Sequence, residues 1–334
     1  MKLKEFHYDL PEDLIAQYPI ENRAEARLLV LDRNAGEITH RRFYEITEFL
    51  SRGDVLVLND TKVFKARLFG KKETGAKIEV LVISYDNYNC TGLVNPGKRI
   101  KENTKIIFAD GIIAEVKKRE KGKSYLEFNK PVKDVIEYLG KVPLPHYIKR
   151  EPDNQDEKEY QTVYAKKTGS IAAPTAGLHF TNELLNVLKE KGVMISNITL
   201  HIGPGTFKPI RLEDIENHYM EPEYVEISEE TAEFIKKGKR VIGVGTSVTR
   251  ALEYVALKNK DKIVPFSGYD DLFIYPGFKF KVIDCLITNF HLPCSTPLLL
   301  VCAFAGRELI FKAYKEAIEK RYRFLSYGDA MLIL

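Results

Sequence analysis

The chain of 334 residues contains no tryptophan and four cysteines. Cys90, Cys285, Cys294 and Cys302 form no C-x-x-C pair, and no histidine lies at zinc-finger spacing from them. Cys285 and Cys302 fall within apolar runs, which is typical of small core residues. We therefore predict neither a disulfide bond nor a structural zinc site.

Long apolar runs are also missing, because charged or polar residues interrupt every candidate. The sequence therefore predicts no membrane-spanning helix. The first residues, Met1-Lys-Leu-Lys-Glu-Phe-His-Tyr-Asp9, lack the apolar core of a signal peptide. Together these absences favour a cytoplasmic protein with no membrane partner.

Basic residues are distributed unevenly along the chain. The net charge of the protein is +4, but residues 61–150 contain 20 Lys/Arg and 10 Asp/Glu, a net charge of +10. The rest carries 31 basic and 37 acidic residues, a net charge of −6. A basic segment in a slightly acidic protein predicts a nucleic-acid contact, although a solubilising surface has the same composition. The candidate contacts are Lys62, Arg67, Lys117, Lys118 and Arg119.

The same basic segment has the pattern of a small β domain. Short alternating stretches, including 76–83, 104–108 and 124–128, are separated by Gly and Asn turns. Short strands at a spacing of roughly ten residues are typical of a barrel. We predict a small antiparallel β-barrel domain over 62–140, inserted into an α/β main domain that residues 1–61 and 141–334 form.

The flanking parts alternate strands with helices, as an α/β domain does. We predict a short helix that begins near Asp9, strands over 194–202 and 271–275, and a helix over 250–257. The charged stretch 151–159 is predicted to be a mobile loop.

Loops rich in Gly, Pro, His and Thr punctuate the α/β part. The most informative is Ile171-Ala-Ala-Pro-Thr-Ala-Gly-Leu-His-Phe-Thr181, which has neither helical nor strand periodicity and precedes a helix that Thr181 can cap. Similar loops are Leu200-His-Ile-Gly-Pro-Gly-Thr-Phe207, Gly245-Thr-Ser-Val-Thr-Arg250 and Asn289-Phe-His-Leu-Pro293. Ligands of α/β folds bind at the carboxyl ends of the strands. We therefore predict that these loops share one active site.

Two of the loops are candidates for binding polar groups of a ligand. The Gly245–Arg250 turn can present N–H groups and hydroxyls, and Arg250 can clamp a carboxylate, unless it is simply a surface residue of a capped helix. The turn lacks the G-x-x-x-x-G-K-[ST] pattern of a P-loop. Pro209 follows the 200–207 loop closely, which argues against a dinucleotide-binding turn that continues into a helix.

His179, His201 and His291 lie in or beside these loops. Histidine is suited to proton transfer near neutral pH, although each could equally be a hydrogen-bonded structural residue. Their spacing matches no metal motif such as H-E-x-x-H, so we predict no metal. Near the end of the chain, 322–331 is either a packed terminal strand or an edge that presents Ser326, Tyr327 and Asp329 to a ligand.

Taken together, these motifs resemble the S-adenosylmethionine:tRNA ribosyltransferase-isomerase family of queuosine biosynthesis. The matching stretches span residues 8–331 and are Tyr8-Asp-Leu-Pro, Ile15-Ala-Gln-Tyr-Pro, Leu58-Asn-Asp-Thr-Lys-Val, Tyr160-Gln-Thr-Val-Tyr, Ile171 to Thr181, His201-Ile-Gly-Pro-Gly-Thr-Phe, Asp271-Leu-Phe-Ile-Tyr-Pro-Gly-Phe, Ile287-Thr-Asn-Phe-His-Leu-Pro and Ser326-Tyr-Gly-Asp-Ala-Met. The family usually reads Gly-Thr-Thr-Ser-Val-Arg where this chain has Gly245-Thr-Ser-Val-Thr-Arg250. This departure leaves open which hydroxyl meets the ligand.

The resemblance implies an α/β domain with an inserted barrel, in a cytosolic enzyme. It implies that S-adenosylmethionine is consumed as a ribosyl donor, so that it is a co-substrate and no cofactor is needed. The implied acceptor is tRNA carrying preQ1 (7-aminomethyl-7-deazaguanine) at the wobble position, and the implied products are epoxyqueuosine-tRNA, adenine and methionine. The reaction implied begins with proton loss beside the sulfonium.

That chemistry needs a base, a donor to the departing adenine and a partner for the methionine carboxylate. On the resemblance, we assign His179 as base or acid, Arg250 as the carboxylate clamp, and Asp271 or Asp329 as partners of the ribose or amine. The other substrate-binding candidates are Thr175, Gly177, His201, Gly203, Gly205, Thr206, Thr246, Asn289, His291 and Tyr327. We expect the protein to be a monomer.

Two other functions fit the same sequence. One is an S-adenosylmethionine-dependent RNA methyltransferase, which would release S-adenosylhomocysteine in place of adenine and methionine. The other is a non-catalytic RNA-binding protein whose barrel makes the contact. The grouping of polar loops outside the barrel argues against the second.

Overall fold

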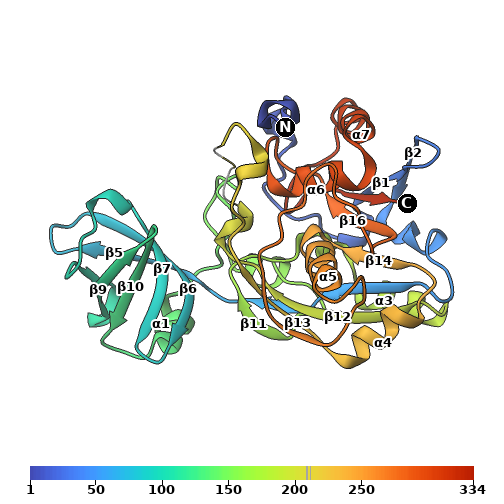
Figure 1. The fold of residues 1–334 in the computed structure, drawn as a ribbon. Helices are drawn as coiled ribbons and strands as arrows, with labels where there is room; N and C mark the ends of the chain where they lie inside the picture. Colours follow the sequence, from blue (N-terminus) through green and yellow to red (C-terminus); the bar gives the residue numbers. More distant parts are fainter. Residues whose placement is uncertain (208–209, 211) are drawn as a thin grey trace.

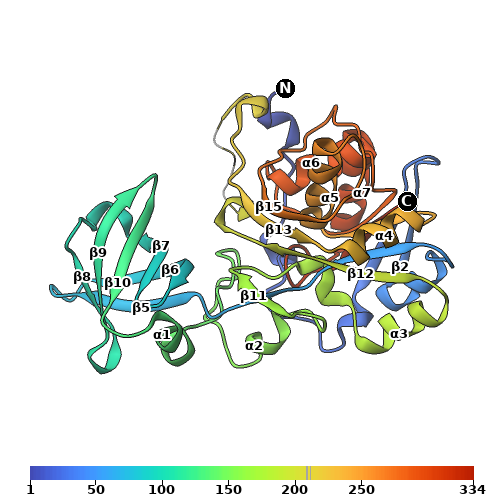
Figure 2. The same cartoon turned by 60° about the horizontal axis from the view of Figure 1, so that its bottom comes forward.

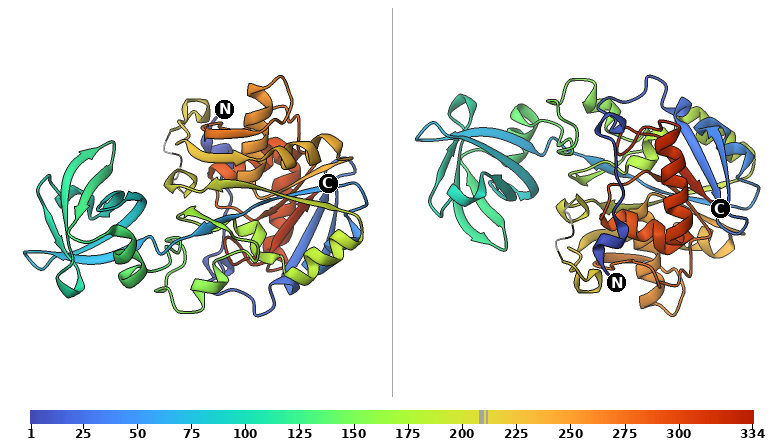
Figure 3. Two further views of the ribbon diagram at one scale, coloured as in Figure 1. Left: turned by 90° about the horizontal axis from the view of Figure 1, so that it is seen from below. Right: turned by 90° about the horizontal axis from the view of Figure 1, so that it is seen from above.

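The protein consists of a large α/β body and a separate small barrel (Figure 1). The computed structural model describes residues 1–207, 210 and 212–334, apart from the side chains of Arg99, Thr206 and Phe207. Both chain ends lie on the α/β body, and the barrel stands to one side of it in every view (Figure 3). This arrangement confirms the predicted fold class.

A nine-stranded mixed sheet forms the centre of the main body. In spatial order its strands are β15 (Phe266–Asp270), β13 (Glu223–Ile227), β12 (Met194–His201), β3 (Val55–Asn59), β14 (Val241–Val244), β16 (Cys285–Asn289), β17 (Ala330–Ile333), β1 (Arg27–Asp32) and β2 (Glu37–Arg42). Strands β12, β3, β14 and β16 are parallel, so their carboxyl ends share one edge. Strand β12 agrees with the strand that was predicted over 194–202.

Helices cover both faces of this sheet because its strands are apolar on both sides. Val55 and Val57 of β3 pack into one core, while Leu56 and Leu58 pack into another, as the alternation of a strand requires. The first core takes in α4 (Glu229–Lys237), α5 (Thr246–Lys258), α6 (Thr296–Ala305) and α7 (Arg307–Glu319). The second takes in α3 (Asn182–Glu190), whose N-cap Thr181 accepts a hydrogen bond from the Leu184 N–H, as predicted.

The inserted domain is a closed barrel of six antiparallel strands. They are, in order around the barrel, β10 (Lys123–Phe128), β7 (Asn89–Asn95), β6 (Lys77–Asp86), β5 (Arg67–Lys72), β8 (Lys105–Ile107) and β9 (Ile113–Glu120). Helix α1 (Val132–Leu139) packs Val132, Val135 and Ile136 into the barrel core. Strand β7 and helix α1 were not predicted from the sequence.

Two neighbouring chain segments join the barrel to the main body (Figure 2). Strand β4 (Thr61–Val63) enters beside β11 (Lys167–Ser170), and the two pair in parallel. Arg67 and Lys141 form an isolated bridge at the barrel end of the connection. The short helix α2 (Asp156–Glu159) lies on the returning segment. The barrel is therefore connected to the main body by two chain segments, and backbone hydrogen bonds hold both segments in place.

Short 3-10 helices complete the described structure. They are η1 (Leu3–Phe6), η2 (Glu12–Leu14), η3 (Arg23–Glu25), η4 (Phe43–Glu48), η5 (Gly97–Arg99), η6 (Ala109–Gly111), η7 (Thr175–His179), η8 (Pro204–Phe207) and η9 (Ile215–Asn217). In the part of the chain that the structure describes, no helix combines the length and the apolar character needed to cross a membrane.

Several predicted elements were wrong in extent. Only the turn η2 forms after Asp9, because Ile15 pairs with Phe324 and keeps the chain extended there. The strand predicted over 271–275 is absent, since Asp270 accepts the Leu272 N–H over 2.8 Å and ends β15. Helix α5 begins at Thr246, four residues before the predicted start. The charged loop 151–159 contains α2, and its Asp156 is buried.

Candidate active site

A cavity of about 630 Å³ lies where loops of the main body meet the barrel. The segments that follow β12, β14 and β16 contribute Pro204, Thr246 and His291 to its wall. Leu81 and Leu93 contribute from the barrel. The loops that were predicted to share one edge of the sheet therefore line a common cavity.

The predicted ligand-binding residues divide into two groups by their position relative to this cavity. The lining contains Thr175, Thr246, Asn289 and His291. The described lining does not contain Gly177, His179, His201, Gly203, Gly205, Arg250, Asp271, Tyr327 or Asp329. The side chain of Thr206 lies outside the described part of the protein.

The loop 171–181 contributes its first half to the cavity and buries its second half. Thr175 and Ala176 line the cavity, and the η7 turn then carries His179 into the interior, where it is 4 % exposed. The imidazole packs against the Phe43 ring at 5.0 Å between centroids. Burial, with the charges of Arg23 and Arg323, lowers the pKa of His179 to about 3. His179 is therefore neutral near pH 7.

Gly177 has a packing role in this loop. A Cβ atom at this position would lie 1.9 Å from Oη of Tyr164 and 3.0 Å from Cγ2 of Thr162. Only glycine lets the η7 turn come this close to the Tyr164 ring. Oη of Tyr164 is buried without a hydrogen-bond partner among the described residues.

Asn289 connects the buried histidine to the cavity. Its side chain is 2 % exposed, yet the residue belongs to the cavity lining. Nδ2 lies 3.2 Å from the Leu325 carbonyl oxygen and 3.3 Å from Nε2 of His179. Oδ1 has no hydrogen-bond partner among the described residues. A residue of the cavity lining thus carries a buried hydrogen-bond acceptor that no described group satisfies.

His291 is the one of the three predicted histidines that lines the cavity. Its Nε2 lies 2.7 Å from Oγ1 of Thr288, and Tyr8 donates its hydroxyl to the His291 carbonyl oxygen. Burial lowers the pKa of His291 to about 3, so this imidazole is also neutral near pH 7.

Arg250 lies behind the Gly245–Ser247 turn and is held by two buried carboxylates. Its Nε donates to Oδ2 of Asp270 over 2.7 Å, and its Nη2 donates to Oε2 of Glu223 over 2.5 Å. Burial alone would lower the pKa of Arg250, but the two carboxylates outweigh burial and raise it. Glu223 also accepts the Gly203 N–H, so this cluster ties two of the polar loops together.

His201 and the glycines after it lie beside the cavity. Nδ1 of His201 is 2.8 Å from Oγ1 of Thr61, and its ring stacks on Tyr224. Gly169 lies under the same ring, because a Cβ atom there would be 2.5 Å from Nε2 of His201. Burial lowers the pKa of His201. Ile202 and Pro204 reach the cavity from this loop, whereas Gly203 and Gly205 do not.

The three carboxyl-terminal candidates have other partners. Asp329 is buried and accepts the backbone N–H groups of Arg27 and Arg323 over 2.9 and 2.8 Å. Tyr327 donates to Oδ1 of Asp156 over 2.6 Å. Asp271 is exposed, and its neighbour Asp270 points to the Arg250 cluster.

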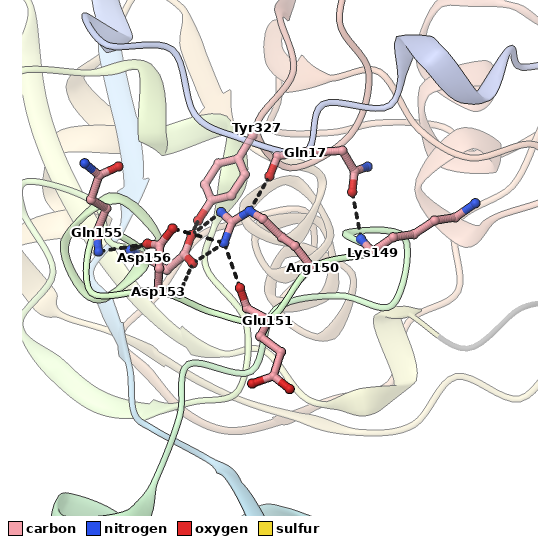
Figure 4. A network of polar contacts seen from close by, with 8 residues as sticks. All are labelled: Gln17, Lys149, Arg150, Glu151, Asp153, Gln155, Asp156 and Tyr327. Atoms are coloured by element: carbon pink, nitrogen blue, oxygen red, sulfur yellow. Dashed lines mark hydrogen bonds and ion pairs between the residues drawn. The ribbon is translucent and has the colours of Figure 1, made fainter.

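Figure 4 shows the network around Tyr327. The Arg150 guanidinium donates to both carboxylate oxygens of Asp156, over 2.6 and 2.7 Å, and its Nε donates to the Gln17 carbonyl oxygen over 2.9 Å. The adjacent Ser326 lines the cavity and is 2.6 Å from the hydroxyl of Tyr147. The network thus fixes the segment that returns from the barrel against one wall of the cavity.

Ser326 and the hydroxyls of the Gly245–Arg250 turn were candidates from the sequence, whereas two other cavity residues, His146 and Tyr147, were not predicted. The last two belong to the segment 142–148, where they follow Pro143 and Pro145, and this segment was interpreted only as the return of the chain to the main domain. Among the lining residues that the structure describes there is no Asp or Glu. No described group of three His, Cys, Asp or Glu side chains is placed to hold a metal ion.

The predicted nucleic-acid contacts of the barrel have different surroundings. Lys62 is exposed, and Lys117 and Lys118 are exposed in ion pairs with Glu115, Glu127 and Glu120. Arg119 donates to the carbonyl oxygens of Gly97 and Ile100, which is a structural role. Arg67 pairs with Glu79, donates to the Leu144 carbonyl oxygen and lines the cavity.

Comparisons with known proteins agree over the whole length of the chain. Residues 3–333 match the family described as queuosine biosynthesis protein. Proteins named S-adenosylmethionine:tRNA ribosyltransferase-isomerase from Carboxydothermus hydrogenoformans, Staphylococcus haemolyticus and Halothermothrix orenii are 51 %, 51 % and 52 % identical, each covering 100 % of both chains.

A solved structure is also similar. The crystal structure of an S-adenosylmethionine tRNA ribosyltransferase from Thermotoga maritima has 36 % sequence identity and a TM-score of 0.56, and the match covers 99 % of this chain and 100 % of the other. A family match over nearly every residue and relatives that are half identical lead to one conclusion. The chain belongs to the queuosine biosynthesis protein family.

Proposed function

We propose that this protein is an S-adenosylmethionine:tRNA ribosyltransferase-isomerase. It transfers the ribosyl group of S-adenosylmethionine to the aminomethyl group of preQ1 at the wobble position of tRNA and isomerises it. The products are epoxyqueuosine-tRNA, adenine and methionine. The names of relatives that are 51–52 % identical over the full chain support this proposal.

One structural observation carries the proposal, namely the position of the cavity. A two-substrate enzyme needs a site that a small molecule and a macromolecule reach together. The cavity volume of about 630 Å³ is within the range of small-molecule sites, and its wall joins main-body loops to the barrel residues Leu81 and Leu93. We assign residues 1–61 and 141–334 to catalysis and the barrel over 62–140 to contact with tRNA.

The lining suggests how the donor is held. The α5 helix begins at Thr246, so Thr246 and Ser247 offer hydroxyls and free N–H groups at the positive end of a helix dipole. We assign this turn, in place of Arg250, to the methionine carboxylate. Arg67 is the one Lys or Arg among the described lining residues, and it lies on the barrel side in an ion pair with Glu79.

The decisive experiment is product analysis. The protein is incubated with S-adenosylmethionine and preQ1-tRNA, and the nucleosides and small molecules are identified by mass spectrometry. We expect epoxyqueuosine, adenine and methionine, with no product from tRNA that carries guanine at the wobble position. S-adenosylhomocysteine would indicate a methyltransferase instead. Binding of tRNA with no turnover would indicate a non-catalytic RNA-binding protein.

We further propose that the working form is a cytoplasmic monomer that needs no metal. The absence of any described three-residue metal group is compatible with this proposal. Light scattering with and without tRNA tests the monomer, and turnover after treatment with EDTA tests the requirement for metal. Loss of turnover that Mg²⁺ or Zn²⁺ restores would contradict the proposal.

A further inference from the structure

We infer that His179 is a positioning residue that holds the amide of Asn289, whose Oδ1 accepts a hydrogen bond from an N–H or O–H group of S-adenosylmethionine. In this assignment His179 neither contacts the substrate nor takes its proton. The inference rests on the proposed function, because it takes the cavity to be the site of S-adenosylmethionine. It replaces the role of base or acid that the family resemblance suggested for this histidine.

The orientation of the Asn289 amide follows from its backbone partner. The carbonyl oxygen of Leu325 can only accept a hydrogen bond, so the amide atom 3.2 Å from it must be the donor Nδ2. The same Nδ2 lies 3.3 Å from Nε2 of His179. Nε2 must therefore be the unprotonated nitrogen of a neutral imidazole, and the ring acts as an acceptor.

Both Nδ2 hydrogens are directed to protein acceptors, so Oδ1 is the only polar atom of the amide that is left for a ligand. Oδ1 is buried and has no partner among the described residues, although Asn289 belongs to the cavity lining. Buried acceptors without partners are uncommon because they lose their hydrogen bonds to water. A hydrogen-bond donor on a ligand in the cavity satisfies this oxygen.

The composition of the cavity wall makes this acceptor important. The described lining contains no Asp or Glu, so N–H and O–H groups of a ligand depend on neutral acceptors. S-adenosylmethionine carries such donors on its adenine, its ribose and its α-amino group. An amide oxygen serves each of these groups without adding a buried negative charge.

His179 itself is placed to support Asn289 and not to reach the cavity. It is 4 % exposed, packs on Phe43 and lies outside the described lining. Burial, and then the charges of Arg23 and Arg323, lower the pKa of this imidazole, which keeps Nε2 available as an acceptor. Because Nε2 stays unprotonated, it can accept a hydrogen bond from Nδ2 of Asn289 and hold the amide in place.

The inference predicts different effects for His179→Gln, His179→Phe and Asn289→Ala. His179→Gln places an amide oxygen where it can accept from Nδ2, whereas His179→Phe keeps the ring and removes the acceptor. We expect His179→Gln to keep S-adenosylmethionine affinity within about fivefold and turnover within about tenfold. We expect His179→Phe and Asn289→Ala each to weaken S-adenosylmethionine binding by about tenfold or more, with a raised KM. The double variant His179→Phe/Asn289→Ala should bind no more weakly than Asn289→Ala alone, because residues that act as a unit are not additive.

The measurements are titration calorimetry with S-adenosylmethionine and steady-state kinetics of each variant, with melting temperature as the check on folding. General base catalysis contributes about 10²–10⁴ in rate, so an acid–base role would make Gln as damaging as Phe in kcat, with normal donor affinity. That result overturns the inference. Competition by 5′-methylthioadenosine and by methionine then shows which half of the donor binds Asn289, because Asn289→Ala weakens the binding of that half alone.

The calorimetry also distinguishes failure of this inference from failure of the proposed function. If the wild-type protein makes no epoxyqueuosine but binds S-adenosylmethionine, and the variants bind it in the order given, the function is wrong and the positioning role stands. If wild-type turnover is normal and additive losses occur in the double variant, the positioning role is wrong and the function stands.

Discussion

Arg150 binds Asp156 through two hydrogen bonds of 2.6 and 2.7 Å, and the Asp156 side chain is 1 % exposed. Tyr327 donates to the same carboxylate, so the pair joins the segment that returns from the barrel to the last turn before β17. Ser326, which lines the cavity, is the neighbour of Tyr327. An ion pair outside the cavity thereby fixes part of its wall.

Replacing Asp156 should destabilise the protein strongly. Asp156→Asn leaves the Arg150 guanidinium without its charged partner, and breaking a buried pair typically costs about 3–5 kcal/mol. Urea denaturation measures the loss. Asp153→Asn is the matched control, because Asp153 is half-exposed and its pair with Arg150 is longer, at 3.5 Å, so we expect a cost of at most about 1 kcal/mol. Equal costs for the two variants would contradict the structural role of the pair.

The same carboxylate makes part of the stability dependent on pH. Burial raises the pKa of Asp156, but hydrogen bonds from Arg150 and Tyr327 outweigh burial and lower it. The folded pKa is thus below the unfolded value of about 3.9, so the stabilisation is complete above that value and is lost as the pH falls through the folded pKa. The difference in unfolding free energy between wild type and Asp156→Asn should therefore be constant from pH 6 to 8, on the order of the values above, and shrink below about pH 4.

Substitution of Arg250 tests whether this residue stabilises the fold or binds the ligand. Arg250→Met leaves Glu223 and Asp270 buried without their cation, and we expect a loss of about 3–5 kcal/mol in unfolding free energy. Arg321→Met is the control, since its ion pair with Asp13 is exposed to solvent and we expect its loss to leave the unfolding free energy nearly unchanged. Normal stability of Arg250→Met combined with lost S-adenosylmethionine affinity would instead identify Arg250 as the carboxylate clamp.

Gly177 can be tested by a compensating substitution. Gly177→Ala places a Cβ atom 1.9 Å from Oη of Tyr164, and overpacking of this kind costs about 1–3 kcal/mol. Tyr164→Phe removes that oxygen, which has no described hydrogen-bond partner. We therefore expect Tyr164→Phe alone to be nearly neutral, and the double variant to recover most of the stability in thermal denaturation. A double variant as unstable as Gly177→Ala would show that the backbone, and not the clash with the hydroxyl, needs glycine.

Substitution of the barrel lysines should affect tRNA binding, whereas substitution of Arg119 should affect the stability of the barrel. Lys117→Gln/Lys118→Gln should flatten the dependence of log K on log salt by about 0.7–0.9 for each phosphate that the variant no longer binds, with little change in stability. Arg119→Gln should lower barrel stability, because it removes the donors to the Gly97 and Ile100 carbonyl oxygens. Filter binding from 50 to 200 mM salt covers the range in which affinity falls steeply, by roughly 10³–10⁵ for proteins that bind many phosphates. A slope that stays unchanged would place the tRNA-binding site on another surface.

The order of elements along the chain was largely predictable, because it depends on local patterns. The strand predicted over 194–202 corresponds to β12, and the alternating stretches indicated the barrel. Strand β7 was missed because it contains Gly92, where a Cβ atom would lie 2.8 Å from the Leu81 carbonyl oxygen. Gly92 is needed because β6 lies so close to β7 at this point. The sequence alone does not show that β6 is the neighbour of this segment.

The loops of the candidate site were predictable, but the directions of their side chains were not. His179 and Asn289 belong to two different loops, and only the fold shows that one supports the other. Asp270 and Asp271 are adjacent, so they project to opposite faces at a strand end, and the resemblance emphasised the exposed one. The partner of Arg250 could be found only from the pairing of β13 with β15, which brings Glu223 opposite Asp270.

The position of β17 also constrains how the chain can assemble. Residues 330–333 form an interior strand between β16 and β1, so the edge of the β1–β2 hairpin stays open until these residues have been synthesised. The barrel, in contrast, comprises one continuous stretch and can close while synthesis continues, since domains generally fold as units during translation. A ribosome stalled before residue 330 would therefore carry a finished barrel attached to an unfinished sheet.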